Sequence, residues 1–232
     1  MAASDVLDPP ASILVFEAHS DDAVIGMGAT IKKFSDQGTT ITQVTVTKGE
    51  TAHTLENVDD IVEIRRAEGT QADAILGVTT HVFLDHGCQA VENDRPTFQE
   101  FVKLIRKFRP DWIFTHAPSE WHRDHRAISA IAEEAWWKAS EQNVLPELGE
   151  PFRAKACLFY EVLPMFTQPD VCLDVSAQWQ AKLDALECFA SQAQNMSFHG
   201  LVEGKGLYRG YLVGAAHAES FVYSTFLPRD RF

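Results

Sequence analysis

The chain has no apolar run long enough to cross a membrane, and this absence narrows the classes of protein to consider. No segment reaches the ~18 consecutive apolar residues of a spanning helix. Residues 1–10 are acidic and end in proline, so they lack the basic start and apolar core of a secretory signal. We therefore expect a soluble, cytoplasmic protein without a membrane partner, whose residues 1–10 form a flexible N-terminus.

Basic residues are also scarce. Lysine and arginine number 20 against 33 aspartates and glutamates, which gives a formal net charge of -13. No local basic patch interrupts this excess, so the surface would repel the phosphates of a nucleic acid. We expect no nucleic-acid partner.

Cysteine is rare and no pair is closely spaced. Cys88, Cys157, Cys172 and Cys188 are scattered without a Cys-x-x-Cys pair, and each lies in or beside an apolar segment. This pattern disfavours a zinc site built from cysteines and predicts buried, reduced thiols.

Motifs of the common α/β enzymes and nucleotide-binding proteins are missing as well. Gly26 and Gly28 begin a dinucleotide-binding fingerprint, but Ile31 stands where its third glycine belongs. There is no Gly-x-Ser-x-Gly elbow and no P-loop, so serine hydrolases and P-loop nucleotide-binding proteins are disfavoured.

The residues that are present predict one α/β domain over 1–232. Short apolar or β-branched strands alternate with segments of helical spacing, which predicts a Rossmann-like, mostly parallel sheet with helices on both faces. Strands are expected at 12–18, 39–47, 81–84, 112–114, 158–162 and 171–175. Helices are expected at about 24–37, 59–76, 98–108, 123–140 and 177–192.

The glycine-rich C-terminal region has a different sequence pattern. Five glycines fall between residues 200 and 214, so we expect irregular structure with one short helix beyond Asn195. A final strand is expected at 221–225.

Two short polar clusters follow predicted strands. His19-Ser20-Asp21-Asp22 comes directly after the first strand, and His122-Arg123-Asp124-His125 comes after the loop of the fourth. In open parallel sheets, ligands bind beyond the carboxyl ends of strands, where neighbouring crossovers diverge. Two histidines and one carboxylate suffice for catalytic zinc, and a second aspartate could accept a proton from water.

Each cluster alone has a simpler explanation. Paired aspartates after a strand are often only a helix N-cap, and His122 and His125 could be solvated residues. The same ligand types also form the two-His-one-carboxylate site of non-haem iron oxygenases, although those usually have a β-barrel scaffold. Only the occurrence of both clusters at strand ends favours a metal-dependent hydrolase.

The two clusters belong to a longer series of motifs that resembles the PIG-L/LmbE-type zinc-dependent N-deacetylases. The series contains Ala18-His19-Ser20-Asp21-Asp22, Thr47-Lys48-Gly49-Glu50, Arg65-x-x-Glu68 before Leu76-Gly77-Val78, His122-x-Asp124-His125-Arg126, and a later block with Asp174, Lys182 and Ser191-Gln192. The resemblance spans roughly residues 12–192, and it is nearest to the diacetylchitobiose and related N-acetylglucosaminide deacetylases.

This resemblance implies an activity and assigns roles. The enzyme would remove the acetyl group from an amino-sugar amide, releasing acetate and a free amine. Zinc, or another divalent ion, would bind His19, Asp22 and His125. Asp21 would be the general base, His122 would stabilise the tetrahedral intermediate or protonate the leaving amine, and Asp124 would orient an imidazole. Arg65 and Glu50 would contact a small-molecule amino-sugar substrate, and relatives of this type often form homo-oligomers. Apart from the resemblance, Trp121 is a further candidate to line the sugar site, because it stands beside His122.

Three positions depart from the family pattern. Ser20 replaces a proline, Lys48 replaces an aspartate, and Phe189 stands where many members have histidine. None of these changes removes a predicted metal ligand, although Lys48 inverts a charge near the pocket rim. A catalytically silent sugar-binding relative is the remaining alternative, and the retention of Asp21 and His122 argues against it. His116 is equally consistent with a pocket residue and a satisfied loop histidine.

Overall fold

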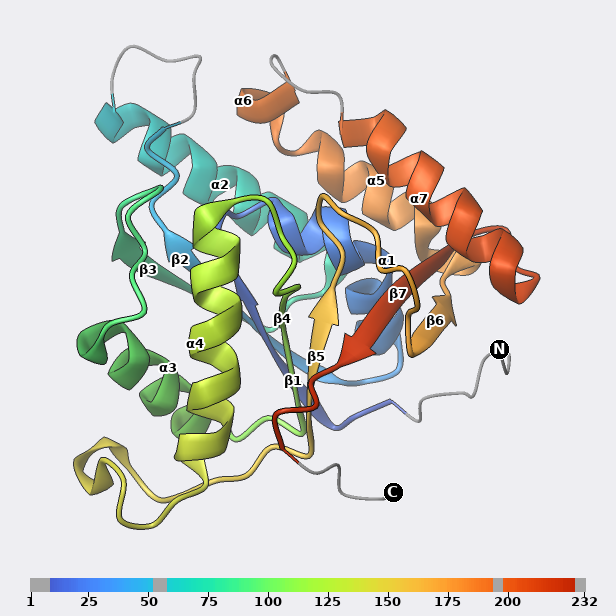
Figure 1. Cartoon of the computed structure of the whole chain (residues 1–232). Coiled ribbons are helices and arrows are strands. Elements are labelled where there is room, and N and C mark those ends of the chain that lie inside the picture. The colour runs from blue at the N-terminus through green and yellow to red at the C-terminus, as the bar shows by residue number, and fades with distance from the viewer. Residues whose placement is uncertain (1–8, 52–57, 194–197, 228–232) are drawn as a thin grey trace.

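The seven described strands form one sheet (Figure 1). The computed structural model describes residues 9–51, 58–193 and 198–227, so most of the predicted N-terminal flexible segment lies outside the described residues. The strands are β1 (Ser12–Glu17), β2 (Thr40–Thr47), β3 (Thr80–His86), β4 (Trp112–His116), β5 (Ala156–Tyr160), β6 (Val171–Asp174) and β7 (Ala218–Tyr223).

The sheet is mostly parallel, as predicted. Its order is β3-β2-β1-β4-β5-β7-β6, and β7 pairs antiparallel with both β5 and β6. The chain moves outward from β1 to β3 and then returns to β4 on the other side of β1. The crossovers therefore diverge between β1 and β4, where the two polar clusters emerge.

Helices cover both faces of the sheet, which confirms the expected layers (Figure 1). One face carries α3 (Arg95–Phe108) and α4 (Arg123–Ala139), and the other carries α1 (Asp22–Asp36), α2 (Val58–Leu76), α5 (Trp179–Glu187), α6 (Ala190–Ala193) and α7 (Phe198–Val213). In the described part of the chain, none of these helices has the length and apolarity that crossing a membrane requires.

The four cysteines are all free thiols, as expected. Cys88 and Cys157 are buried, whereas Cys172 and Cys188 are only partly buried, so the prediction of burial holds for two of them.

The C-terminal region is more regular than predicted. Where the glycines suggested irregular structure, α7 runs for 16 residues. A Cβ at Gly206 would lie 2.3 Å from the ring of Trp179, and one at Gly210 would lie 2.7 Å from the carbonyl oxygen of Ala215. These glycines therefore allow close packing of a helix, which sequence alone does not distinguish from flexibility.

Several other boundaries also differ from the prediction. Strand β5 begins at Ala156 rather than 158, and α3 begins at Arg95 rather than 98. The single helix expected over 177–192 is instead two helices: α5 ends at Glu187, and the short α6 begins at Ala190. The last strand covers 218–223 rather than 221–225, since Ala218 and Glu219 already pair with β6.

Helix α1 is broken at Met27, whose backbone has φ -150° and ψ 22°. A buried ion pair supplies the hydrogen bonds that the break removes. Lys182 Nζ donates to the carbonyl oxygen of Ile25 at 2.9 Å and pairs with the Glu219 carboxylate at 2.6 Å. Glu219 in turn accepts the N–H groups of Ala29 and Thr30. The ion pair therefore joins the two halves of α1.

This arrangement predicts a large stability loss in Lys182→Met. The substitution leaves Glu219 as an unpaired buried charge, so the free energy of unfolding should fall by about 3–5 kcal/mol. Urea denaturation followed by circular dichroism measures the loss. Lys32→Ala is the control, because Lys32 pairs with Asp36 near the surface and should cost at most about 1 kcal/mol. Equal losses in the two variants would contradict the role given to the buried pair.

Candidate metal and catalytic site

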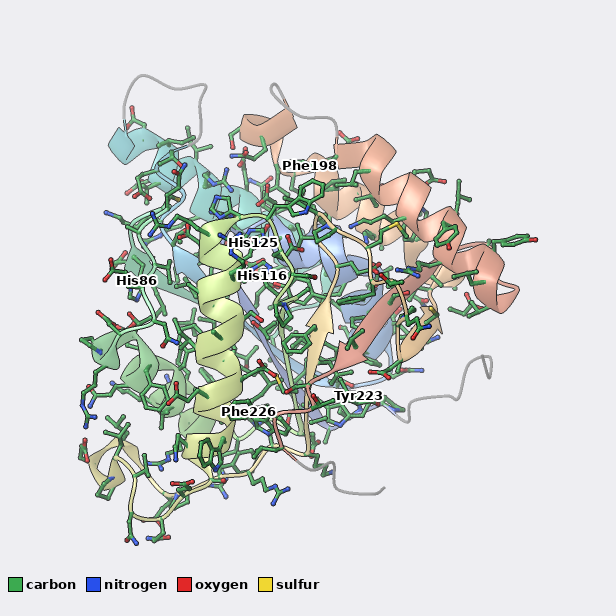
Figure 2. All side chains as sticks on the ribbon, viewed as in Figure 1. His86, His116, His125, Phe198, Tyr223 and Phe226 are labelled. Atoms are coloured by element: carbon green, nitrogen blue, oxygen red, sulfur yellow. The ribbon has the colours of Figure 1, made fainter. Side chains whose placement is uncertain are left out.

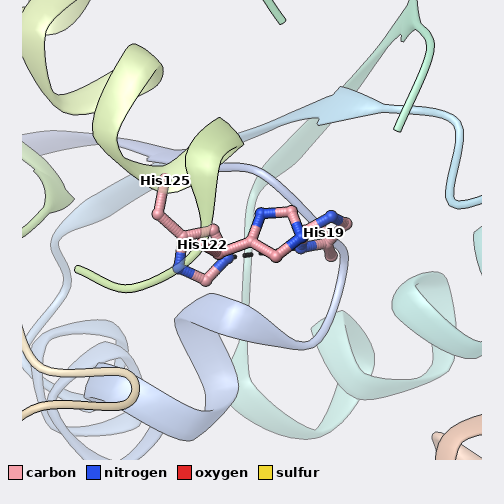
Figure 3. Close-up of side chains that lie close together, drawn as sticks. All are labelled: His19, His122 and His125. Atoms are coloured by element: carbon pink, nitrogen blue, oxygen red, sulfur yellow. Dashed lines mark hydrogen bonds between the residues drawn. The ribbon is translucent and has the colours of Figure 1, made fainter. Parts of the chain in front are cut away.

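Three polar side chains converge beyond the carboxyl ends of β1 and β4. His19 and Asp22 come from the turn between β1 and α1, and His125 comes from the first turn of α4. His19 Nδ1 and His125 Nε2 each lie 3.2 Å from Asp22 Oδ2 and 3.3 Å from each other. The three atoms thus form a nearly equilateral triangle. Figure 3 shows His19 facing His122 and His125 across this site.

The triangle has the dimensions of one face of a tetrahedral coordination shell, which has four ligand positions. Bonds of about 2.0–2.1 Å at tetrahedral angles separate neighbouring ligand atoms by about 3.3 Å. The backbone N–H of His19 also donates to Asp22 Oδ2 at 2.8 Å, which fixes the carboxylate within its own turn. These residues therefore fit a divalent metal ion, in both donor chemistry and spacing.

The electrostatics of the site follow from burying one carboxylate between two imidazoles. Burial opposes ionisation of Asp22, but His125 and His19 outweigh it and hold its pKa well below the usual range. Burial likewise opposes charge on His125, yet Asp22 raises its pKa to about 9. The pKa of His19 is raised well above its ordinary value by Asp22 against the same opposition. Without a metal, protons therefore occupy the ligand atoms at neutral pH.

Asp21 lies at the N-cap position of α1 but makes no capping bond with its side chain. Glu17 instead accepts the N–H of Ala23 in the first turn, at 3.0 Å. The simple N-cap explanation for the paired aspartates therefore does not describe Asp21. Its Oδ1 lies 3.4 Å from Nη2 of the buried Arg65.

The lack of a side chain at Gly49 leaves the space that the Arg65 guanidinium occupies. Its φ is +75°, and a Cβ there would lie 2.5 Å from Arg65 Nε. The glycine of the Thr-Lys-Gly-Glu motif thus satisfies both a left-handed backbone and a close approach of the guanidinium.

His122 and Asp124 lie beside the triangle. The His122 ring centroid is 4.8 Å from that of His19 and 4.9 Å from that of His125. Its Nδ1 accepts the N–H of Asp124 at 3.3 Å and so caps α4. Burial, together with the nearby His19 and His125, lowers the pKa of His122 and favours its neutral form.

Asp124 is completely buried and has neighbours on two sides. Its Oδ2 lies 3.8 Å from His19 Nε2 and 3.9 Å from His122 Nδ1. The carboxylate also accepts the N–H groups of Gln89 and Val91 at 2.6 and 3.2 Å. Gln89 has a left-handed φ of +60°, so Asp124 stabilises a strained turn next to the site.

A cavity of about 260 Å³ opens onto the triangle. Its lining has a polar part, which includes Asp21, Arg65 and Gln89, and an apolar part, here called the apolar wall. The wall residues are Ile25, Val162, Leu163 and Phe198. Figure 2 shows Phe198 at the same end of the molecule as His116 and His125.

Glu50 and Trp121 are not among the cavity-lining residues of the described chain. Glu50 Oε1 accepts the N–H of Cys88 at 2.8 Å, so its carboxylate supports the turn next to Gln89. Trp121 has an exposed fraction of 71% and lies next to His122 in sequence. Their predicted substrate contacts stay predictions.

Sequence reasoning left His116 open and did not identify the residues around it. The structure buries His116, and its Nε2 accepts the N–H of Ala18 at 2.9 Å, so this nitrogen is engaged by the backbone. Its ring stacks on His125 at a centroid distance of 3.9 Å. Cys88, Gln89 and the apolar wall had no sequence signal, because they come from separate loops and helices that only the fold brings together.

Two similar proteins of known activity match nearly the whole chain. A diacetylchitobiose deacetylase of Thermococcus kodakarensis is 30% identical, over 93% of this chain and 84% of its own length. A 4-oxalmesaconate hydratase of Pseudomonas putida is 25% identical, over 93% and 88%. These two relatives are a deacetylase and a hydratase, and the oxygenase alternative gains no support from them.

A solved structure and a family model agree with these relatives. The N,N'-diacetylchitobiose deacetylase of Pyrococcus horikoshii superposes with a TM-score of 0.86 at 25% identity, covering 96% of this chain and 88% of its own. The model of the GlcNAc-PI de-N-acetylase family matches residues 14–136, which contain both polar clusters. With the same motifs, the same fold and this match, the chain belongs to the PIG-L, or GlcNAc-PI de-N-acetylase, family.

Proposed function

We propose that the protein is a zinc-dependent N-deacetylase that removes the acetyl group from an N-acetylglucosamine-type amino sugar or glycoconjugate. His19, Asp22 and His125 would hold the ion. The observation that carries the proposal is the triangle of donor atoms, 3.2–3.3 Å apart, beside an aspartate whose carboxylate does not cap its helix. Family membership and the deacetylase relatives support the same reaction.

The reaction needs a nucleophile and a proton acceptor. When bound, zinc supplies Lewis acidity, which polarises the amide carbonyl and makes water more acidic. Asp21 borders the cavity and is outside the donor triangle, so its carboxylate can accept the proton from the attacking water and pass it to the amine nitrogen as the C–N bond breaks. Arg65 Nη2, 3.4 Å from Asp21 Oδ1, orients that carboxylate.

His122 can stabilise the charge that develops on the carbonyl oxygen. Its Nδ1 accepts the Asp124 N–H, so the proton of the neutral ring lies on Nε2. The Nε2–H group of this half-buried ring borders the cavity, where it can donate a hydrogen bond to the oxyanion. Among the two roles implied by the family resemblance, the capping bond thus favours oxyanion stabilisation over proton donation to the leaving amine.

The shape of the cavity suits a small neutral substrate. The apolar wall can contact the acetyl methyl group and the C–H face of a sugar ring, and the polar side can bind hydroxyl groups. Cys88, Gln89 and Gln192 border this polar side.

Hydration of an acid such as 4-oxalmesaconate is a weaker candidate. A multiply charged carboxylate substrate requires several cationic partners. Among the described cavity residues, Arg65 is the one permanent cation, and Asp21 already lies beside it. The charge of the cavity therefore favours a neutral amide. The cytoplasmic location and the homo-oligomer expected from sequence stay predictions.

Asp21→Asn should lower kcat for acetate release by at least ~100-fold, because the amide cannot accept the proton from water. Acetate release is measured on a panel of N-acetyl sugars, with oxalmesaconate-type acids in parallel. Zinc content should stay unchanged, since Asp21 is outside the donor triangle. Asp36→Asn, on the exposed end of α1, is the matched control. Full activity of the Asp21 variant with zinc bound would refute the role of this residue.

Zinc binding to the metal-free protein at pH 7 should release protons, approaching two per ion. His125, with a pKa of about 9, and His19, with its raised pKa, must both lose their protons to ligate. Affinity should therefore rise as the pH is raised through the pKa of His125, about 9. Titration calorimetry in two buffers of different ionisation enthalpy counts the protons. Binding at pH 7 without proton release would rule out this ligand pair.

A further inference from the structure

Glu120 is a buried carboxylate that no sequence motif singled out. It lies in the loop between β4 and α4, two residues before His122, and its side chain is completely buried. A buried carboxylate is unfavourable unless several hydrogen bonds satisfy it. The partners of its two oxygens lie in different parts of the site.

One oxygen of Glu120 holds the apolar wall of the cavity. Oε1 accepts the N–H groups of Val162 and Leu163 at 3.0 and 3.1 Å. From the opposite side, Lys205 Nζ donates to the carbonyl oxygens of Val162 and Glu161 at 2.6 and 3.0 Å. The segment after β5 is therefore held between an anion on its amide side and a cation from α7 on its carbonyl side.

The other oxygen of Glu120 faces a predicted metal ligand. Oε2 lies 3.4 Å from His125 Nδ1, while Nε2 of the same ring belongs to the donor triangle. A carboxylate behind an imidazole retains the proton on the near nitrogen and leaves the lone pair of the far nitrogen for a metal. It also fixes the plane of the ring.

We propose that Glu120 is a positioning residue that sets the tautomer of His125 and, through the same carboxylate, the distance between the metal site and the apolar substrate wall. The proposal rests on the proposed function, because it takes His125 as a zinc ligand. Lys205 acts mainly on the wall, since both its described hydrogen bonds go to backbone carbonyls beyond β5 and none goes to Glu120 or His125. The two residues should therefore have separable effects.

Glu120→Gln separates the two tasks of the carboxylate. The amide oxygen must face the two backbone N–H groups, so the NH₂ group replaces the acceptor in front of His125 Nδ1. Zinc affinity, measured by competition with a chromogenic chelator, should fall about 10–100-fold, the usual effect of losing such a partner. KM for the N-acetyl sugar at saturating zinc should change little.

Lys205→Met is the matched comparison. Removing its ammonium releases the wall but leaves His125 and its partner intact, so KM should rise several-fold while zinc affinity stays at the wild-type value. Thermal unfolding of both variants shows how much of each population is folded, and affinities are expressed per folded protein. Zinc affinity of Glu120→Gln within twofold of wild type would mean that Glu120 only satisfies the backbone, and the proposal would fail.

A measurement on the unaltered enzyme makes the test independent of how the variants fold. Long-range proton–nitrogen NMR of the zinc-loaded protein should show the His125 proton on Nδ1. A proton on Nε2 would overturn both the tautomer and the ligand assignment. Absence of acetate release by the wild type, with zinc bound and the expected loss of affinity in Glu120→Gln, would instead refute the deacetylase reaction and leave the positioning role intact.

Discussion

The site depends on a single carboxylate oxygen, Asp22 Oδ2, which lies within 3.2 Å of an imidazole nitrogen of both His19 and His125. The two histidines are separated by more than a hundred residues, and the pairing of β1 with β4 is what brings them together. Any movement of α1 relative to α4 changes the distance between these atoms. The parallel core of the sheet thus sets the dimensions of the proposed metal site.

Burying these charged side chains costs free energy unless each has a partner. A carboxylate without partners at this depth would be strongly destabilising, so the surrounding chain supplies partners for nearly every charge it buries. Asp124 holds the turn at Gln89, Glu120 holds the segment after β5, and Lys182 pairs with Glu219. Each pair links two loops or elements distant in sequence. The polar interior therefore restrains the loops on which the cavity depends.

The sequence predicted the parts of this structure that are encoded locally. Apolar strands alternate with helical periodicity, so the α/β class, most elements and the layers followed directly, and the motifs identified His19, Asp22 and His125 as candidates. Glu120 and the apolar wall could not be predicted, because an isolated acidic residue or valine has no pattern until the fold supplies its neighbours. Helix α7 was predicted too short, because Gly206 serves packing against Trp179. The sequence alone does not show whether a glycine provides flexibility or close packing.

The break in α1 has a consequence for how this protein can be recombined with its relatives. The family match ends at residue 136, whereas Lys182 and Glu219, which join the two halves of the helix, come from α5 and β7. Asp22 lies in the first of those halves. Residues of α5 and β7 are therefore part of the scaffold that holds the proposed metal ligand Asp22. A chimera that exchanges only the C-terminal elements must therefore keep a cation in place of Lys182 and an anion in place of Glu219. Without this pair, the first turn of α1, which carries Asp22, will shift relative to the rest of the helix.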